Sequence, residues 1–158
     1  MARFETRKAL RWSAFFIAWL FVGLAQADAC RMPADAVRVQ ARTVFDGDTL
    51  ELTDGRRVRL IGINAPEIGR QGKPSEPFAR AAEARLQALT QGALYLAPGK
   101  ESRDRYGRTL GHLFDAAGHN LEAQLLAEGL GFAIGVPPNL TLVVCHLEAE
   151  QRARRMGL

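Results

Sequence analysis

The sequence has 158 residues, of which 47% are hydrophobic and 24% charged, and it contains 15 glycines and 7 prolines. This length and composition suit one globular domain and exclude disordered, collagen-like and coiled-coil classes. Four of the 21 basic and one of the 17 acidic residues lie within the first 27, which leaves 17 basic against 16 acidic side chains in the rest. Attraction of an acidic partner by overall charge is therefore excluded, and any anion-binding site must be local.

The N-terminal 27 residues have the pattern of a secretory signal peptide. A basic stretch precedes the uncharged, apolar segment Trp12–Ala25, which is shorter than the ~20 residues that span a bilayer, and Ala25-Gln26-Ala27 is a small-residue cleavage pattern. We expect residues 1–27 to direct export and residues 28–158 to form a periplasmic or secreted domain without stable membrane association. The alternatives are an uncleaved anchor and lipidation of Cys30, which is disfavoured because Ala27 stands where lipoprotein signals favour Leu.

Three strands are expected at the start of this domain. Val37–Arg42 alternates apolar and polar residues, and this period of two is typical of a strand with one buried face. Thr49–Leu52 is the second strand and Arg56–Ile63 the third, with a hairpin turn at Thr53-Asp54-Gly55 between them. The three strands are predicted to form a meander.

The rest of the chain is predicted to add two strands and three helices. Ser75 is a candidate cap for a helix that continues to the stop signal at Gly92, and Asn120 caps a shorter helix that ends at Gly129. The further elements are the strands Ala93–Leu96 and Thr109–Phe114 and the helix Cys145–Met156. Five strands with helices after the third and the fifth favour an α+β fold whose sheet closes as a small barrel.

The turn Asp46-Gly47-Asp48 lies between the first two strands. Asp-Gly in such a place is usually a plain hairpin turn, for which one aspartate suffices. Two carboxylates on one tight turn also form an oxygen-rich corner that suits a hard cation. Both interpretations stay open on this motif alone.

The third strand carries an arginine and leads into a constrained segment. Arg59 lies between Val58 and Leu60, so it belongs to the face opposite those apolar residues, which is more often simply a solvated face. Pro66 restricts the backbone before it, so that Asn64 and Glu67 are held on a stiff exit from the strand. The same Asn-x-Pro pattern is also an ordinary turn signal.

Arginines gather again between residues 103 and 108, where Arg103, Arg105 and Arg108 flank Tyr106. This segment is either a solvated loop or a phosphate site, because guanidinium groups bind phosphate oxygens bidentately. The three histidines of the chain have no partner at metal-ligand spacing and are expected to be surface or packing residues. The chain also has no glycine-rich phosphate loop and no serine in a nucleophile elbow.

Together these motifs resemble the thermonuclease, or staphylococcal nuclease-like, family. The resemblance extends from about Val37 to the C-terminus. It is carried by the segments Asp46-Gly47-Asp48-Thr49-Leu50, Val58-Arg59-Leu60-Ile61-Gly62-Ile63-Asn64-Ala65-Pro66-Glu67, Glu76-Pro77-Phe78-Ala79, Asp104-Arg105-Tyr106-Gly107-Arg108-Thr109-Leu110-Gly111, Asn120-Leu121 and Gly129-Leu130. It implies a five-stranded OB-fold barrel with three helices. It further implies calcium-dependent hydrolysis of phosphodiester bonds in DNA or RNA with little sequence preference.

The resemblance also implies roles for individual residues. Asp48 matches a direct metal ligand, Asn64 stands where a second metal-binding carboxylate is usual, Ala65 offers its carbonyl, and Asp46 supports the ligands. Because Asn64 is uncharged, we expect weaker calcium affinity than an aspartate would give.

The remaining matched residues concern the phosphate. Glu67 matches the residue that positions or deprotonates the attacking water, Arg59 and Arg108 match the pair that binds the scissile phosphate, and Tyr106 matches a tyrosine beside it. These residue types agree with the chemistry of phosphodiester hydrolysis, because attack of water on a phosphodiester needs a base and fixed positive charge.

Two other function classes would use these residues differently from a nuclease. A catalytically weak or inactive OB-fold module that binds nucleic acid would keep the barrel without needing Glu67, Arg59 and Arg108. A periplasmic structural module would have no use for paired carboxylates and guanidinium groups. We expect a monomer whose partner is nucleic acid. The two cysteines, Cys30 and Cys145, are predicted to form a disulfide because export leads to an oxidising compartment.

Overall fold

The computed structural model describes residues 30–158 and shows an α+β fold. The expected signal peptide, residues 1–27, lies outside the described residues. Within residues 30–158, a 6-stranded sheet has the order β1-β6-β7-β4-β3-β2, in which only β4 and β7 are parallel neighbours. Its strands are β1 (Val37–Val39), β2 (Ala41–Val44), β3 (Thr49–Leu52), β4 (Arg57–Leu60), β6 (Leu94–Arg103) and β7 (Thr109–Asp115).

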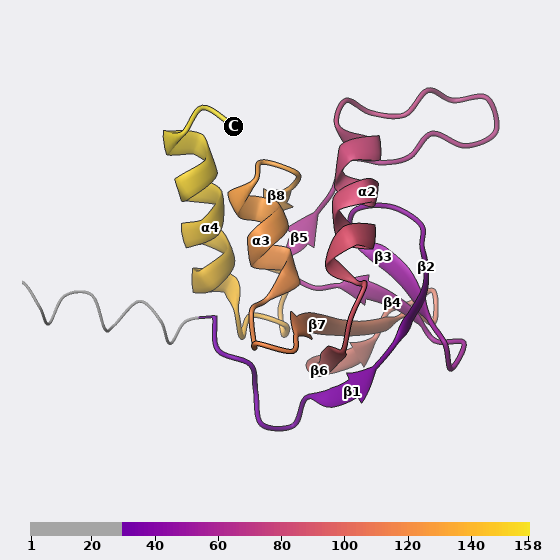
Figure 1. Cartoon of the computed structure of the whole chain (residues 1–158), viewed down its shortest axis with the longest axis vertical. Coiled ribbons are helices and arrows are strands. Elements are labelled where there is room, and N and C mark those ends of the chain that lie inside the picture. Colours follow the sequence, from indigo (N-terminus) through magenta and orange to yellow (C-terminus); the bar gives the residue numbers. More distant parts are fainter. Residues whose placement is uncertain (1–29) are drawn as a thin grey trace, which may run out of the picture.

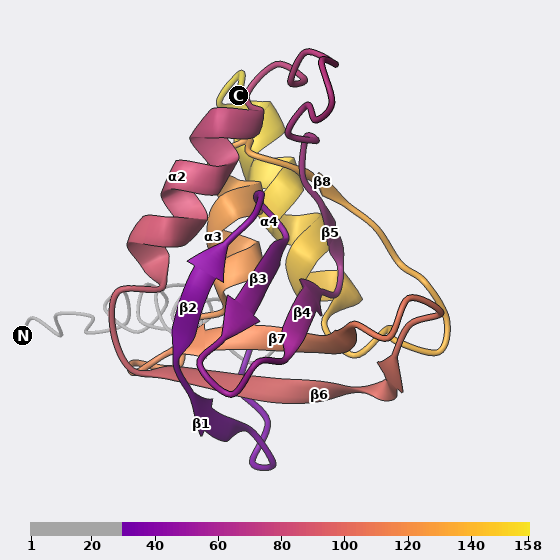
Figure 2. The ribbon, with the colours of Figure 1, turned by 90° about the vertical axis from the view of Figure 1, so that its right-hand side faces the viewer.

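The sheet is curled, and β1 and β2 connect its two edges. Only Gln40 separates these strands along the chain, yet β1 pairs with β6 at one edge and β2 pairs with β3 at the other. The predicted strand Val37–Arg42 is therefore two strands, because a bend at Gln40 lets one segment reach both edges. Figure 2 shows β6 and β7 running across the base of the molecule while β2, β3 and β4 rise from it. This arrangement is the half-barrel expected of an OB-fold.

The predicted strand Arg56–Ile63 is also divided. The backbone of Gly62 has φ +85°, a left-handed conformation that turns the chain out of the main sheet after β4. The next residues form β5 (Ile63–Asn64), which pairs with β8 (Phe132–Ala133) in a separate 2-stranded sheet. Sequence patterns did not predict β8. This small sheet brings Asn64 close to a segment almost 70 residues further along the chain.

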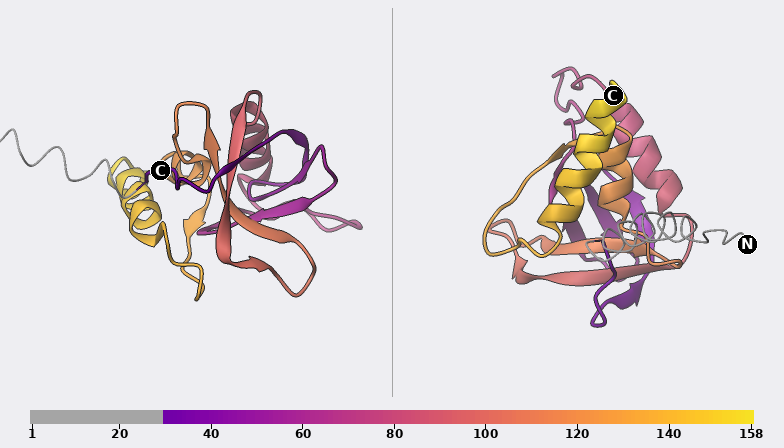
Figure 3. Two further views of the ribbon diagram at one scale, coloured as in Figure 1. Left: turned by 90° about the horizontal axis from the view of Figure 1, so that it is seen from below. Right: turned by 90° about the vertical axis from the view of Figure 1, so that its left-hand side faces the viewer.

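Within the described chain, three helices lie side by side and cover one side of the curled sheet (Figures 1 and 3). They are α2 (Ala79–Leu89), α3 (Leu121–Ala127) and α4 (Val143–Arg155). The Asn120 side chain accepts a hydrogen bond from the Ala123 amide, so the predicted cap of α3 is confirmed. The predicted cap of α2 is wrong. That helix begins after Phe78, and the Ser75 hydroxyl instead accepts a hydrogen bond from the Gly69 amide at 3.1 Å.

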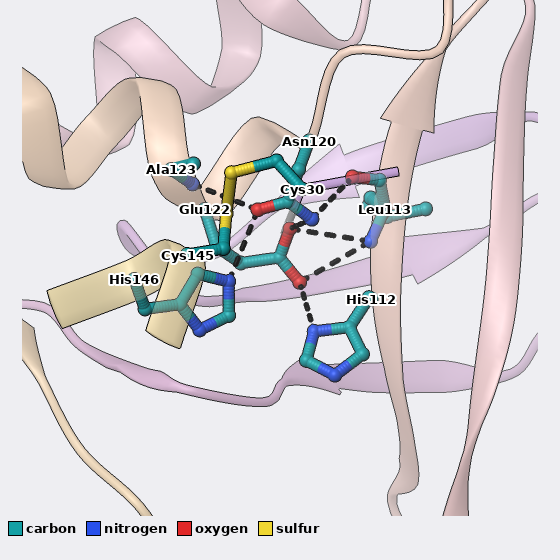
Figure 4. Close-up of a disulfide and its surroundings, with 8 residues drawn as sticks. All are labelled: Cys30, His112, Leu113, Asn120, Glu122, Ala123, Cys145 and His146. Atoms are coloured by element: carbon teal, nitrogen blue, oxygen red, sulfur yellow. Dashed lines mark hydrogen bonds and ion pairs between the residues drawn. A yellow bond between two sulfur atoms is a disulfide. The ribbon is translucent and has the colours of Figure 1, made fainter. Parts of the chain in front are cut away.

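The core lies between the sheet and the helices. Val58 and Leu60 are buried while Arg57 is exposed and Arg59 half-buried, as the alternation along this strand predicts. Burying such apolar side chains is the main favourable contribution to folding. No helix within residues 30–158 combines the length and hydropathy of a membrane span. Cys30 is bonded to Cys145, across a sequence separation of 115 residues, so the segment before β1 is attached to the first turn of α4 (Figure 4).

Candidate active site

Most of the sequence-predicted site residues converge on one cavity, which we call the active-site cavity; Ala65 and Tyr106 do not line it. Its volume is about 710 Å³, and it lies where β3, β4, β5 and the loop after β5 meet. Its lining includes six of the expected residues: Asp46, Asp48, Arg59, Asn64, Glu67 and Arg108. A hollow of about 770 Å³ lies at the edge formed by β1, β2 and the end of α2, and its charged lining residues are Arg38, Arg42 and Asp54. This hollow has a single carboxylate, whereas the active-site cavity combines several carboxylates with several guanidinium groups.

The turn before β3 fixes the first two carboxylates. Asp46 Oδ1 accepts a hydrogen bond from the Asp48 amide at 3.0 Å, so Asp46 shapes the turn that presents Asp48. A side chain on Gly47 would place its Cβ 2.6 Å from the Cβ atoms of both Ala65 and Ala82. Only glycine therefore lets this turn lie directly against the loop after β5 and the start of α2.

Asp48 is a buried carboxylate with several partners. Its Oδ1 accepts a hydrogen bond from the Thr49 hydroxyl at 2.9 Å, and its Oδ2 accepts one from the Ala65 amide at 2.8 Å. Arg59 Nη2 lies 3.1 Å from the same Oδ2. Burial nevertheless raises the pKa of Asp48 to about 6, against the lowering effect of Arg59. The desolvated carboxylate would thus be stabilised further by an additional cation.

Arg59 connects Asp48 to the end of β5. Its Nη1 donates hydrogen bonds to the carbonyls of Leu60 and Ile63, and its Nη2 donates one to Asn64 Oδ1 at 3.3 Å. The oxygens of Asp48 and Asn64 therefore converge on one positively charged group. Carboxylate, amide and carbonyl oxygens are the donors that calcium prefers, so this set fits a hard divalent cation.

Glu67 lies on the loop that follows β5, where its exposed side chain lines the active-site cavity. Among the described residues, its carboxylate has no hydrogen-bond or ion-pair partner, while its backbone is held on both sides. The Glu67 amide donates to Glu76 Oε2 at 2.8 Å, and the Glu76 amide donates to the Glu67 carbonyl at 3.0 Å. Sequence reasoning missed this supporting role of Glu76, although the residue belongs to a motif that it had noted.

Arg108 reaches the cavity from the turn before β7. Its Nε donates to Asp104 Oδ2 at 2.7 Å, and its amide donates to Asp104 Oδ1 at 2.9 Å. Burial acts to raise the pKa of Asp104, but the hydrogen bonds from Arg108 and the Tyr106 amide hold that pKa below its usual value. Asp104 is therefore a charged anchor that orients the Arg108 guanidinium.

Tyr106 lies outside the active-site cavity. It lines a neighbouring hollow with Arg57 and Arg108, and its side chain is 68% exposed. Its hydroxyl accepts a hydrogen bond from Arg105 Nη2 at 2.7 Å, and the Arg108 guanidinium lies 5.5 Å from the ring centroid. Tyr106 thus lies beside Arg108, which enters the cavity, but Tyr106 itself is on the outer rim of the cavity.

A second polar cluster joins β7, α3 and α4, and sequence reasoning missed it because its members are distant in the chain (Figure 4). His112, Glu122 and His146 are all buried, with ligand-type atoms within 4.8 Å of one another. Glu122 accepts hydrogen bonds from the Leu113 amide and from the Asn120 side chain, and it contacts His112 Nδ1 at 3.2 Å. The carboxylate is thereby satisfied by protein donors, as expected of a structural network.

The half-barrel and its helices define an OB-fold protein. The carboxylates and arginines in one cavity give this protein a site suited to a cation and an anionic substrate. The chain belongs to the staphylococcal nuclease homologue family, whose model matches residues 57–158. This membership confirms the resemblance and the fold class expected from the sequence.

Three relatives illustrate the similarity. A thermonuclease of Staphylococcus intermedius is 33% identical over 121 residues, covering 74% of this chain and 71% of that protein. A thermonuclease of Staphylococcus hyicus is 30% identical over 117 residues, covering 72% and 69% respectively. An uncharacterized endonuclease of Escherichia coli O157:H7 is 30% identical over 118 residues, covering 73% and 72%. The comparisons therefore support a nuclease.

Proposed function

We propose that this protein is a calcium-dependent nuclease that hydrolyses phosphodiester bonds of DNA or RNA with little sequence specificity. One observation carries the proposal. Side chains from the turn before β3, from β4, from β5 and its following loop, and from the turn before β7 meet in one cavity. Membership of the staphylococcal nuclease homologue family and nuclease relatives at 30–33% identity support it.

Asp48, Asn64 and the Ala65 carbonyl would hold the calcium ion, and Asp46 would keep Asp48 in place through the turn. When bound, the ion supplies positive charge that stabilises the negative charge developing on the phosphate oxygens. Because one ligand is an amide, the site has one negative charge fewer than a pair of aspartates would provide.

Glu67 would accept a proton from the water that attacks phosphorus, since its carboxylate is exposed to the cavity. A new phosphorus–oxygen bond forms as the bond to the leaving oxygen breaks. Arg59 and Arg108 would bind the non-bridging oxygens, where their fixed charges stabilise the transition state more than the ground state. Tyr106 would contact the substrate at the rim of the cavity.

We further propose that residues 1–27 direct export and that the domain acts as a monomer in the periplasm or outside the cell. A purified domain of residues 28–158 is therefore the form to assay. It is incubated with single- and double-stranded DNA and RNA, in calcium and in a chelator. We expect cleavage of nucleic acid only in calcium.

Two variants test the residue roles. Glu67→Gln and Arg108→Ala should each lower turnover by about 100-fold or more while the protein remains folded. Arg80→Ala is a matched control, because Arg80 is an exposed residue of α2 that pairs with Glu83. Binding of nucleic acid without cleavage would favour the alternative, an inactive OB-fold binding module. Unchanged turnover in both variants would refute the mechanism.

A further inference from the structure

The chain segment that turns from β4 into β5 is attached to Asp48 at both ends. The Leu60 amide donates a hydrogen bond to the Asp48 carbonyl at 2.8 Å, and the Ala65 amide donates one to Asp48 Oδ2 at 2.8 Å. Between these attachments the backbone turns at Gly62, two residues before Asn64. The path of the backbone at Gly62 therefore determines where the proposed ligand oxygens that follow it lie relative to the Asp48 carboxylate.

Arg59 depends on the same turn. Its Nη1 donates hydrogen bonds to the carbonyls of Leu60 and Ile63, which lie on either side of the turn, and its Nη2 lies 3.1 Å from Asp48 Oδ2. A shift of the backbone at Gly62 would move these carbonyls and displace the guanidinium with them. The turn thus places both the proposed calcium ligands and an arginine proposed to bind phosphate.

The imidazole of His146 lies directly against this turn. A Cβ on Gly62 would be 1.9 Å from Nδ1 and 2.3 Å from Cε1 of the ring. In glycine an α hydrogen takes this direction, so the hydrogen points at the ring edge that carries Nδ1. His146 is buried and belongs to α4, so the contact joins the turn to a helix that is distant in the chain.

Hydrogen bonds on the other side of the ring leave Nδ1 without a hydrogen (Figure 4). The Asn120 amide nitrogen donates to Glu122 and to the Leu113 carbonyl, so Asn120 Oδ1 is the atom that lies 3.1 Å from His146 Nε2. Nε2 therefore carries the hydrogen of the neutral ring, and Nδ1 is bare. Burial lowers the pKa of His146 to about 4, so the ring is neutral at neutral pH.

Packing alone does not explain a histidine at this position. Nδ1 is buried and has no hydrogen-bond partner in the described structure, which costs free energy that an apolar side chain would avoid. An apolar side chain, however, would present methyl or methylene groups to Gly62, and their hydrogens cannot approach the backbone as closely as a bare nitrogen. The nitrogen also accepts a weak contact from the α hydrogen. The bare edge of His146 is therefore suited to supporting a tight turn.

Neighbouring elements hold the turn and the ring together. The Ile61 amide donates to the Gly111 carbonyl at 3.1 Å, and the Ile134 amide donates to the Gly62 carbonyl at 3.0 Å. On the side of the helix, the residue before the histidine is Cys145, which is bonded to the segment before β1. The close contact is thus fixed from both sides and transmits the position of α4 to the turn.

We propose that His146 is a positioning residue for the calcium ligands: its bare Nδ1 edge supports the turn at Gly62 and so holds the oxygens of Asn64 and Ala65 close to Asp48. The proposal deepens the proposed function and rests on it for the calcium site. His146 contacts neither the ion nor the substrate. It acts as an outer residue that orients the ligands, and loss of such residues typically weakens metal binding.

Three substitutions of His146 separate its two edges. Asparagine can place an acceptor oxygen near the position of Nδ1 but cannot reach Asn120. Glutamine can donate to Asn120 from near the position of Nε2 but has no acceptor at the position of Nδ1. Leucine provides neither group. If the edge that faces Gly62 matters, His146→Asn should retain calcium affinity and the other two variants should lose it.

Calorimetric titration of the domain with calcium chloride, without nucleic acid, measures this affinity. We expect His146→Gln and His146→Leu to bind calcium about 10- to 100-fold more weakly, and His146→Asn to stay within about threefold of the unsubstituted domain. The number of sites per chain should not change, because the folded protein keeps its ligands. In cleavage assays the calcium concentration for half-maximal activity should rise in parallel, while turnover in saturating calcium should fall less.

A matched control separates positioning from general loss of stability. Leu52 is buried at the end of β3 and does not line the active-site cavity. Leu52→Ala should lower the melting temperature by leaving a cavity in the core. Below its melting temperature it should bind calcium with unchanged affinity. Loss of folded protein would lower the number of sites in the titration and leave the affinity as it is.

The outcomes distinguish this proposal from the proposed function. Unchanged calcium affinity in all three variants would overturn the positioning role, as would equal weakening in His146→Asn and His146→Gln or weakening in His146→Asn alone. Failure of the unsubstituted domain to bind calcium would also overturn it. Calcium binding without cleavage by the unsubstituted domain would refute the nuclease function, while the titrations would still decide the role of His146.

Discussion

Arg59 forms an ion pair with Asp48 inside the active-site cavity, with 3.1 Å between Nη2 and Oδ2. The same Nη2 donates a hydrogen bond to Asn64. The proposed roles give these groups different partners, since Asp48 and Asn64 would hold calcium and Arg59 would bind phosphate. Without either ligand, the arginine and the carboxylate neutralise each other. Calcium must therefore compete with the Arg59 guanidinium for the oxygens of Asp48 and Asn64.

Asn64→Asp should tighten calcium binding, because it adds a charged ligand beside Asp48. We expect an increase in affinity on the order of tenfold, measured by calorimetric titration of the domain without nucleic acid. Gln87→Glu is a useful control, because it adds the same charge at an exposed position of α2 that does not line the cavity. Equal or weaker affinity in Asn64→Asp would show that residue 64 does not face the ion.

Gly62→Ala should destabilise the fold strongly. A Cβ at this position would lie 1.9 Å from His146 Nδ1, and the backbone has φ +85°. Gly55 provides a matched control, since it has φ +86° but nothing lies within 4 Å of its Cβ position. Gly55→Ala should cost about 1 kcal/mol for its backbone conformation, and Gly62→Ala about 3 kcal/mol or more because of the clash. Urea unfolding measures both, and equal losses would contradict the close contact with His146.

His146 should make stability depend on pH. The Asn120 amide nitrogen donates hydrogen bonds to Glu122 and to the Leu113 carbonyl, so the Asn120 Oδ1 atom faces His146 as an acceptor. His146 Nε2 therefore donates a hydrogen bond to Asn120 Oδ1. Its buried Nδ1 has no partner in the described structure. Burial, with an opposing contribution from Glu122 and a further lowering by His112, lowers the pKa of His146 to about 4 from 6.5.

The direction in which stability changes with pH follows from proton uptake by His146. Between pH 6.5 and 4 the unfolded chain binds the proton more readily than the folded protein, so stability falls as pH falls. The expected loss is up to ~3 kcal/mol, measured by urea unfolding. Asp48, whose raised pKa of about 6 acts in the opposite direction, titrates in an overlapping range. Comparison with His146→Gln isolates the contribution of His146 to the pH dependence of stability. Identical stability–pH profiles of the variant and the parent would refute that contribution.

The bond between Cys30 and Cys145 should be present in protein produced in an oxidising compartment. Thiol titration of the denatured mature chain should find no free thiol without reductant and two with it. Because the bond closes a loop of more than 100 residues, reduction should cost about 2–4 kcal/mol of unfolding free energy, below the ~4.7 kcal/mol of the chain-entropy estimate. Two free thiols without reductant would show that the residues are unpaired or that Cys30 is modified.

Several local features were determined by the sequence itself. Thr49–Leu52 is a strand with the predicted bounds, and Asn120 caps the helix that follows it. The alternation around Arg59 correctly placed that residue opposite the buried Val58 and Leu60. Such features depend on backbone preferences and hydrogen bonds within a few residues, so neighbouring sequence is enough to specify them. The family resemblance added the correct fold class, because its motifs occur in a specific order and spacing.

Other features were decided only by the tertiary structure. The sequence could not show that the strand after Arg56 breaks at Gly62, where the backbone is left-handed and His146 of the distant helix α4 lies close to it. It could not bring Asn64 opposite Phe132, or His112 and His146 to one carboxylate, since these pairs come from separate elements. Contacts between distant residues depend on how the sheet curls and on which helix faces meet, and short-range propensity carries no information about either.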